Sequence, residues 1–252
     1  MFDRRLLISS PIAVRLFLFI IAGFTISRAI IATQIVSVGW RDATAEYAMA
    51  FLSGIISDSL VAIMLTVVTL SIAGWTRRWH LTRPIGHGIV VGFLFIMTFT
   101  FVAEVFFWNE FSERFNGIAV YYLLFPREVI GNLEESFNLS YYLPVVLTAA
   151  LVFWWPNRRT LGAFLQRPTE HRGWGGRFVR LGRVFAVLAL AVVMLGALPA
   201  RTSDNREVDL LAKNSLVTMA KAALTNDTDY AGSYPTMPQA TALPILRSIV
   251  AQ

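Results

Sequence analysis

Hydrophobic residues fall into five long blocks that are separated by short polar connections. The blocks are Pro11–Thr33, Ala48–Trp75, Gly86–Trp108, Tyr141–Trp155 and Val184–Pro199. A helix needs about 20 apolar residues to cross a bilayer, so the first three blocks are long enough and the last two are at the lower limit. The pattern predicts an all-α, polytopic membrane protein with five transmembrane helices within residues 1–200.

Composition supports this class of protein. The chain is 56% hydrophobic and 15% charged, whereas a soluble domain carries about 25% charged residues. The first block could be a signal peptide, but it is longer than the usual apolar core and no small-x-small cleavage site follows it, so we interpret it as a retained helix. The absence of cysteine excludes disulfides and thiolate metal sites.

The arginines predict the orientation of the chain. The net charge is +6, and with a cytoplasmic N-terminus the cytoplasmic segments hold thirteen arginines against two acids, Asp3 and Glu170. This asymmetry satisfies the positive-inside rule and places the C-terminus outside the cytoplasm. No basic stripe with interleaved aromatic residues occurs on a soluble segment, so we expect no nucleic-acid binding.

Three ionisable residues lie within or at the edge of apolar blocks: Arg28, Asp58 and Glu104. A lone charge in a membrane helix costs about 2.5–3.5 kcal/mol on insertion scales. Because the first two helices run antiparallel, Arg28 and Asp58 are expected at similar depth, toward the extracytoplasmic side. Three interpretations stay open: a structural ion pair between the helices, a polar site that holds a lipid headgroup, and part of a transport pathway.

The connection between the third and fourth blocks, Glu104–Leu139, is rich in aromatic residues and carboxylates. Its residues 107–118 have apolar side chains at helical spacing, which predicts an amphipathic helix at the membrane surface. The next apolar run, Ile118–Phe125, is too short to span, and Pro126 interrupts it. A re-entrant or interfacial helical pair fits this pattern, either as a packing hairpin or as a platform beside a lipid-using active site.

Residues 201–252 form a tail with little apolar mass. Asn205–Leu224 has the helical spacing of apolar residues, Asn226–Pro238 is rich in turn residues, and Ala242–Val250 is expected to form a short helix. About fifty residues of this kind are too few to build an independent core. The tail is therefore interpreted as an extracytoplasmic linker to another unit, or as a cap on one.

Three segments of the central connection carry a family resemblance: FWNEF at 107–111, RFNGIAVYYL at 114–123 and EVIGNLEESF at 128–137. They resemble the N-terminal membrane half of the lipoteichoic-acid-synthase-like, sulfatase-fold phosphoglycerol transferases, and the Gram-negative members above all. Those members often have Asp where this chain has Tyr121. The tail segment EVDLLAKNSL at 207–216 resembles the family's segment after its fifth helix, and the likeness covers nearly the whole chain.

The resemblance implies a location in a bacterial inner membrane, with the tail in the periplasm. In that family a Thr or Ser nucleophile beside a divalent metal, Mn or Mg, transfers a phosphoglycerol unit from phosphatidylglycerol through a covalent intermediate. The catalytic domain would begin about where this sequence stops, at Gln252. We therefore expect no cofactor in this chain and a sulfatase-like catalytic domain in cis or in trans as its partner. The histidines, His80, His87 and His171, have no metal-ligand spacing with acids.

The resemblance thus implies the membrane anchor and lipid-presenting region of a phosphoglycerol- or phosphoethanolamine-type transferase that acts at the outer face of the inner membrane, with membrane lipids as its ligands. The first alternative is a non-catalytic membrane scaffold or assembly partner, and the second is a small transporter. Residues that we expect at the lipid headgroup, or in a structural polar site, share one predicted depth: Arg28, Asp58, Glu104, Trp108, Glu110, Arg114 and Arg127.

Overall fold

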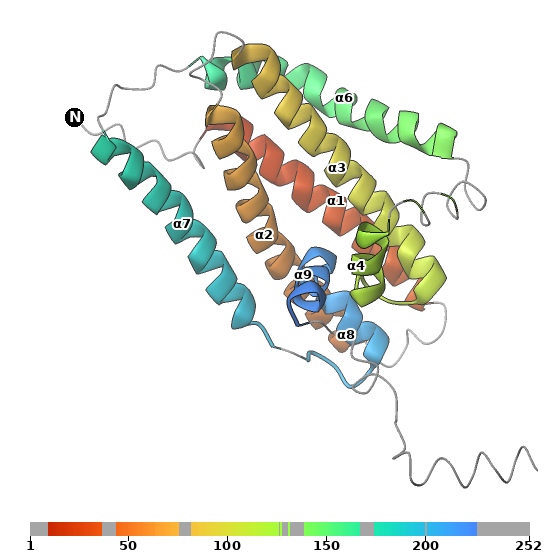
Figure 1. The fold of residues 1–252 in the computed structure, drawn as a ribbon. Helices are drawn as coiled ribbons and strands as arrows, with labels where there is room; N and C mark the ends of the chain where they lie inside the picture. Colours follow the sequence, from red (N-terminus) through yellow and green to blue (C-terminus); the bar gives the residue numbers. More distant parts are fainter. Residues whose placement is uncertain are drawn as a thin grey trace, which may run out of the picture.

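The structure, a computed structural model, describes residues 10–36, 44–75, 82–125, 127, 131, 139–166, 174–199 and 201–225. Every regular element in these ranges is a helix (Figure 1). Three of them are long: α1 (Pro11–Val36), α2 (Thr44–Trp75) and α3 (Thr82–Phe111). Each is long and apolar enough to cross a membrane. The all-helical class predicted from the sequence is therefore confirmed, with three candidate membrane spans in the described residues where the sequence predicts five.

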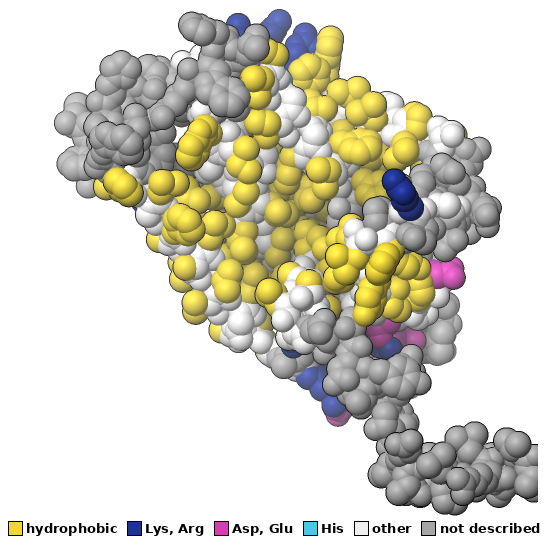
Figure 2. Space-filling model, in the orientation of Figure 1, with side chains coloured by type: hydrophobic (Ala, Val, Ile, Leu, Met, Phe, Trp, Pro, Cys, Tyr) yellow, Lys and Arg dark blue, Asp and Glu magenta, His cyan; other side chains and the backbone are white. Residues whose placement is uncertain are grey.

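Two further helices lie on opposite sides of this three-helix centre. Helix α6 (Leu139–Leu165) packs along α3, and α7 (Trp174–Gly196) packs along α2 (Figure 1). By length and composition neither belongs with the three candidate spans, although α7 contains a shorter apolar run, Leu181–Gly196. Hydrophobic side chains cover much of the visible surface, and basic side chains gather at the end where α3 begins (Figure 2).

Helix α6 is longer than the sequence predicted. We expected a span over residues 141–155 and a basic connection from residue 157, but the helix continues through Pro156 to Leu165. The Asn157 side chain donates to the Phe153 carbonyl oxygen over 2.7 Å, which satisfies one acceptor in the turn at the proline. The extension is held by three buried side chains at helical spacing: Leu161, Phe164 and Leu165.

Helix α7 also differs from its predicted span of 184–199. It begins ten residues earlier, at Trp174, and ends at Gly196. The arginines between residues 174 and 184 predict a polar connection, yet apolar residues alternate with these arginines. Phe178, Val179 and Leu181 are all exposed on α7, as is usual for side chains that face lipid. Arginine can lie in such a stretch because its long side chain reaches toward the aqueous boundary.

The amphipathic helix predicted over residues 107–118 is wrong. Helix α3 extends to Phe111 and stops at Ser112, whose φ of 50° lies in the left-handed region. A new helix, α4 (Gly117–Leu124), begins after Asn116, whose side-chain oxygen accepts from the Ile118 amide over 2.9 Å. The apolar spacing nevertheless reflects a shared core. The side chains of Phe107, Phe111 and Phe115 pack together with Ala119.

The tail forms two short helices, α8 (Arg206–Ala212) and α9 (Ser215–Thr225), instead of one continuous helical stretch. Helix α8 packs against α2 and α1, and α9 packs against α4, at one end of the bundle (Figure 1). The predicted turns over 226–238 and the predicted helix over 242–250 lie outside the described residues. Of the two interpretations of the tail, the cap matches the described part, because α8 contributes four buried residues to a core at this end of the helices: Val208, Leu210, Leu211 and Ala212.

Candidate functional site

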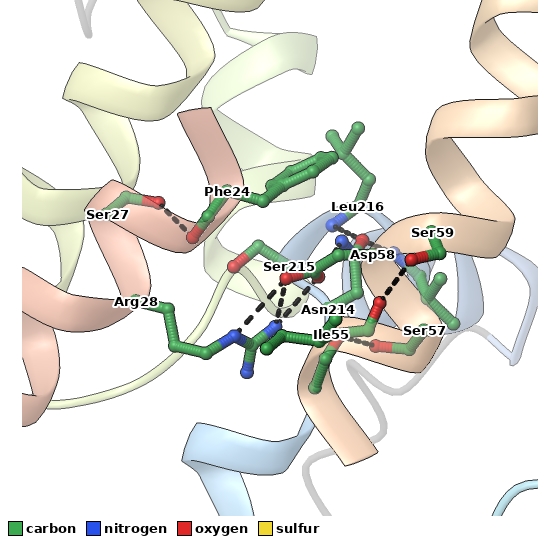
Figure 3. A network of polar contacts seen from close by, with 12 residues as sticks. Phe24, Ser27, Arg28, Ile55, Ser57, Asp58, Ser59, Asn214, Ser215 and Leu216 are labelled. Carbon is green, nitrogen blue, oxygen red and sulfur yellow. Dashed lines mark hydrogen bonds and ion pairs between the residues drawn. The ribbon is translucent and has the colours of Figure 1, made fainter. Parts of the chain in front are cut away.

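Four charged side chains are buried together where the tail meets the bundle (Figure 3 shows part of this network). Arg28 comes from α1, Asp58 from α2 and Glu104 from α3, while Arg114 follows the end of α3. Their relative exposures are 1%, 0%, 1% and 2%, respectively. Such complete burial of charge is tolerated where the charges pair with one another and their polar atoms find hydrogen bonds. We call these four residues the charge cluster.

Arg28 and Asp58 form the first pair of the charge cluster. The Arg28 Nη2 atom donates to both carboxylate oxygens of Asp58 at 2.7 Å, and Nε donates to Oδ2 at 3.2 Å. A planar guanidinium bound to one carboxylate through two nitrogens is among the stronger geometries for such a pair. The ion pair predicted between the first two helices is therefore confirmed.

Glu104 and Arg114 form the second pair. Glu104 also accepts from the Ser27 hydroxyl at 2.9 Å, and Arg114 Nε donates to the Leu210 carbonyl oxygen of α8 at 3.2 Å. Burial and the nearby positive charge of Arg28 lower the pKa of Arg114 to about 9, against the opposing effect of Asp58. The influence of Arg28 and Asp58 on Arg114 indicates that the two pairs form one electrostatic unit.

The junction between α8 and α9 closes the charge cluster. Asn214 donates its side-chain amide to Asp58 Oδ1 over 2.7 Å, and the Ser215 hydroxyl donates to Glu104. The carbonyl oxygen of the Asn214 side chain accepts from the backbone amides of Leu216 and Val217 at 3.0 and 3.3 Å, so the same residue caps α9. Each of these two adjacent tail residues thus binds the acid of a different pair, Asn214 that of the first and Ser215 that of the second.

Additional polar contacts hold α8 around this junction. Asp209 accepts from the Thr202 amide at 2.7 Å and pairs with Lys213 at 2.7 Å. Burial raises the pKa of Asp209, but the bonds from Lys213 and Thr202 outweigh it and hold the pKa below its usual value. The Ser203 hydroxyl donates to Glu46 of α2 over 2.6 Å. The Ser203 bond therefore ties the tail to α2 in addition to Asn214 and Ser215, while the contacts of Asp209 hold the tail itself together.

Little space remains around the Arg28 guanidinium. A Cβ atom built on Gly54 of α2 would lie 2.2 Å from Arg28 Nη1 and 2.3 Å from Cζ. Within the part of the chain that the structure describes, the same Nη1 atom is buried without a hydrogen-bond partner, as is Arg114 Nη2. With the tail docked, the carboxylates are engaged and no solvent-exposed surface is left on any of the four charges. In this arrangement the four charges join α1, α2, the end of α3 and the tail.

The contact with Gly54 leads to a prediction with an unusual sign. Gly to Ala in a helix interior normally stabilises by about 0.5–1 kcal/mol. Gly54→Ala will instead destabilise by about 1–3 kcal/mol, because the new methyl group pushes the guanidinium away from Asp58. Gly92→Ala is the matched control, since a Cβ there meets nothing within 4 Å. Thermal unfolding of the two variants in detergent checks this, and equal effects at both positions would contradict it.

The remaining predicted site residues do not join the charge cluster. Trp108 is buried in the core that α8 shares with α1 and α2, while Glu110 and Arg127 are exposed. The seven residues predicted from one shared depth therefore separate into the four of the charge cluster, Trp108 in a neighbouring core, and two exposed positions. Across the described ranges, no group of three His, Asp or Glu side chains lies together as it would to hold a metal ion. Neither protein-family models, curated proteins nor solved structures give a match to this chain.

Proposed function

We propose that this chain is the membrane domain of a phosphoglycerol-transferase-like enzyme of the sulfatase fold, and that it fixes the tail in place on the extracytoplasmic end of the bundle. In this proposal the chain crosses a bacterial inner membrane five times, and the catalytic chemistry belongs to a sulfatase-like domain in cis or in trans. The observation that carries the proposal is the bond from Asn214 to Asp58, together with that from Ser215 to Glu104.

A simple anchor does not need such bonds. Attachment to a membrane requires apolar helices, whereas a tail that inserts polar groups between buried charges has a fixed position and direction. An enzyme that takes its donor from the bilayer benefits from this, because the reacting group must be held at the height of the lipid headgroups. The docked tail therefore supports a positioning role for the membrane domain.

A second support comes from helix α4, which lies beside the docked tail. Three of its side chains and that of Phe125, which caps its C-terminus, are exposed by 44–69%: Tyr121, Leu123, Leu124 and Phe125. Such a short apolar helix with aromatic residues is suited to the headgroup region of a bilayer. We infer that α4 contacts lipids at the outer surface and that exposed Arg127, which follows it, faces the headgroups. Phosphatidylglycerol is the proposed donor.

The charge cluster itself has a structural role in this proposal. Arg28 and Glu104 are at most 1% exposed, so a headgroup could reach them only if the tail left its place. The lipid-presenting surface is therefore assigned to α4 and its surroundings, and the cluster is assigned to tail docking. A non-catalytic scaffold would need the same docking but would take no part in lipid turnover, which gives an experimental distinction.

The distinction is made by following glycerol label in cells that make this chain. Cells fed radioactive glycerol label the headgroup of phosphatidylglycerol, and transfer moves the phosphoglycerol unit to an acceptor and releases diacylglycerol. Deleting the gene should abolish the transfer of label to envelope acceptors, and the wild-type gene should restore it. If the deletion strain transfers label at the wild-type rate, the enzyme proposal is contradicted and the scaffold takes its place.

Complementation with variants tests the positioning role separately. Asn214→Asp should restore membrane insertion but not transfer, because it removes the amide donor to Asp58 and adds a negative charge beside it. Asn205→Asp should restore both, since Asn205 caps α8 from an exposed position where Asp serves equally well. Full transfer with the Asn214 variant would show that docking of the tail is not required.

A further inference from the structure

A pocket of about 450 Å³ lies at the opposite end of the bundle from the charge cluster, between the first turns of α3 and the C-terminal half of α6. Three arginines line it: Arg83 from α3, and Arg158 and Arg159 from α6. No acidic residue is among its described lining residues. This is the end of the molecule that the arginine distribution predicts to be cytoplasmic, and basic side chains gather there in Figure 2.

His87 adds a neutral hydrogen-bond donor to this pocket. Its Nδ1 accepts from Trp154 Nε1 at 3.0 Å, and the two rings meet edge to face with centroids 5.8 Å apart. Because Nδ1 is an acceptor, the proton of the neutral ring is on Nε2. Nε2 lies 3.7 Å from the position of a Cβ on Gly162, which is on the pocket wall. Trp154 thus sets the tautomer that provides an N–H group on this side.

Arg158 is held in a fixed orientation. Its guanidinium carbon lies 3.5 Å from the centroid of the Trp155 ring, a cation–π contact. Its Nη1 atom is buried and has no hydrogen-bond partner among the described residues. Because Arg158 also lines the pocket, its guanidinium can pair with an anionic oxygen bound there. The first turn of α3 adds the partial positive charge of a helix N-terminus.

We propose that this pocket binds the phosphate group of a phosphodiester, such as the headgroup of an anionic phospholipid in the adjoining leaflet. Three guanidinium groups and the Nε2–H of His87, with no carboxylate among the described lining residues, favour an anion over any cation. The volume admits a phosphate with a small polar substituent such as glycerol. Trp154 and Trp155 mark the depth of the lipid headgroups. The proposal is independent of tail docking, because it uses other residues at the other end of the bundle.

The first test measures lipid preference. The full chain is placed in nanodiscs of phosphatidylcholine with a minority of phosphatidylglycerol, and native mass spectrometry reports which lipid stays bound after release. We expect the wild-type chain to retain phosphatidylglycerol. Arg158→Gln/Arg159→Gln should lower the preference by about fivefold for each arginine replaced, the usual contribution of one basic residue near an anionic lipid surface.

Two variants separate a shaped site from general surface charge. Gly162→Leu keeps every arginine but fills the space beside His87, and it should lower the preference as the double variant does. Arg183→Gln removes an exposed arginine of α7 outside the pocket and should leave the preference unchanged. The proposal is overturned if the double variant keeps the wild-type preference, or if the Arg183 variant loses as much.

The wild-type chain provides a measurement that does not depend on the folding of a variant. A phosphatidylglycerol analogue with a photoreactive headgroup should cross-link to the segment 154–166, and cross-links confined to other helices would overturn the proposal. The deacylated headgroup, glycerophosphoglycerol, distinguishes the source of the phosphate. Protection of the segment by millimolar glycerophosphoglycerol assigns the pocket to a soluble phosphodiester, and continued cross-linking assigns it to the lipid; both results support a phosphate site.

Discussion

Replacing Arg28 with Met while Asp58 is kept will lower the free energy of unfolding by about 3–5 kcal/mol, the usual effect of leaving one partner of a buried ion pair alone. Asp58 is completely buried, and without Arg28 its carboxylate keeps the Asn214 amide as a donor but has no positive charge against it. Reversible unfolding in mixed micelles of mild and denaturing detergent, followed by circular dichroism, measures the loss.

The double variant Arg28→Met/Asp58→Leu should be less damaged than Arg28→Met alone, because it removes the stranded charge along with its partner. Arg201→Met is the control for loss of an arginine at an exposed position, since the Arg201 side chain is 66% exposed, and it should change stability by no more than about 0.5 kcal/mol. Ion pairs on a protein surface contribute less than about 1 kcal/mol to stability. If Arg28→Met lowers the free energy of unfolding by less than this, the Arg28–Asp58 pair is not buried.

Asn214→Asp will release the tail from the bundle. The substitution keeps the size of the side chain and its ability to cap α9, but it replaces the donor to Asp58 with a second carboxylate. Two buried like charges in contact disfavour the docked state by about 3 kcal/mol or more, which is a hundredfold or greater rise in the undocked population. The effect should be confined to the tail, because the Arg28–Asp58 pair remains.

The chain contains no cysteine, so a single introduced thiol reports on undocking. Ala212→Cys places it at a position that is 5% exposed, and its rate of reaction with a membrane-impermeant maleimide should rise about a hundredfold when Asn214→Asp is added. Leu224→Cys, at an 87% exposed position, should react rapidly with or without the second substitution. Slow labelling of residue 212 in the Asn214 variant would show that the tail stays docked without its amide.

The Arg28–Asp58 pair could be predicted because both residues interrupt apolar blocks. A charge in such a block is expensive, and two consecutive antiparallel helices fix which depths can meet, so sequence position alone brought the two residues together. Arg114 and Glu104 were predicted at the same depth, but their contact was not. Arg114 follows the end of α3, and its place depends on the turn at Ser112, whose left-handed φ no local pattern indicated.

Asn214 and Ser215 could not be recognised from their surroundings. Polar residues between two short helical patterns are common in linkers, and the signal they carry is that of a helix cap, which Asn214 also is. Their second role depends on acids more than a hundred residues earlier. The extension of α6 past Pro156 was missed for a different reason. Pro is a frequent helix terminator, but the apolar spacing of Leu161, Phe164 and Leu165 was available and indicates that the helix continues.

The spacing of the charge cluster along the chain implies an order of assembly. Arg28 and Asp58 are 30 residues apart, so they can neutralise each other as soon as the first helical hairpin has entered the bilayer. Asn214 is 156 residues from Asp58, and Ser215 is 111 residues from Glu104. Synthesis from the N-terminus therefore leaves Asp58 and Glu104 without these two tail donors until the junction of α8 and α9 has been made. Docking of the tail through these two bonds is therefore expected only after α1, α2 and α3 have been made.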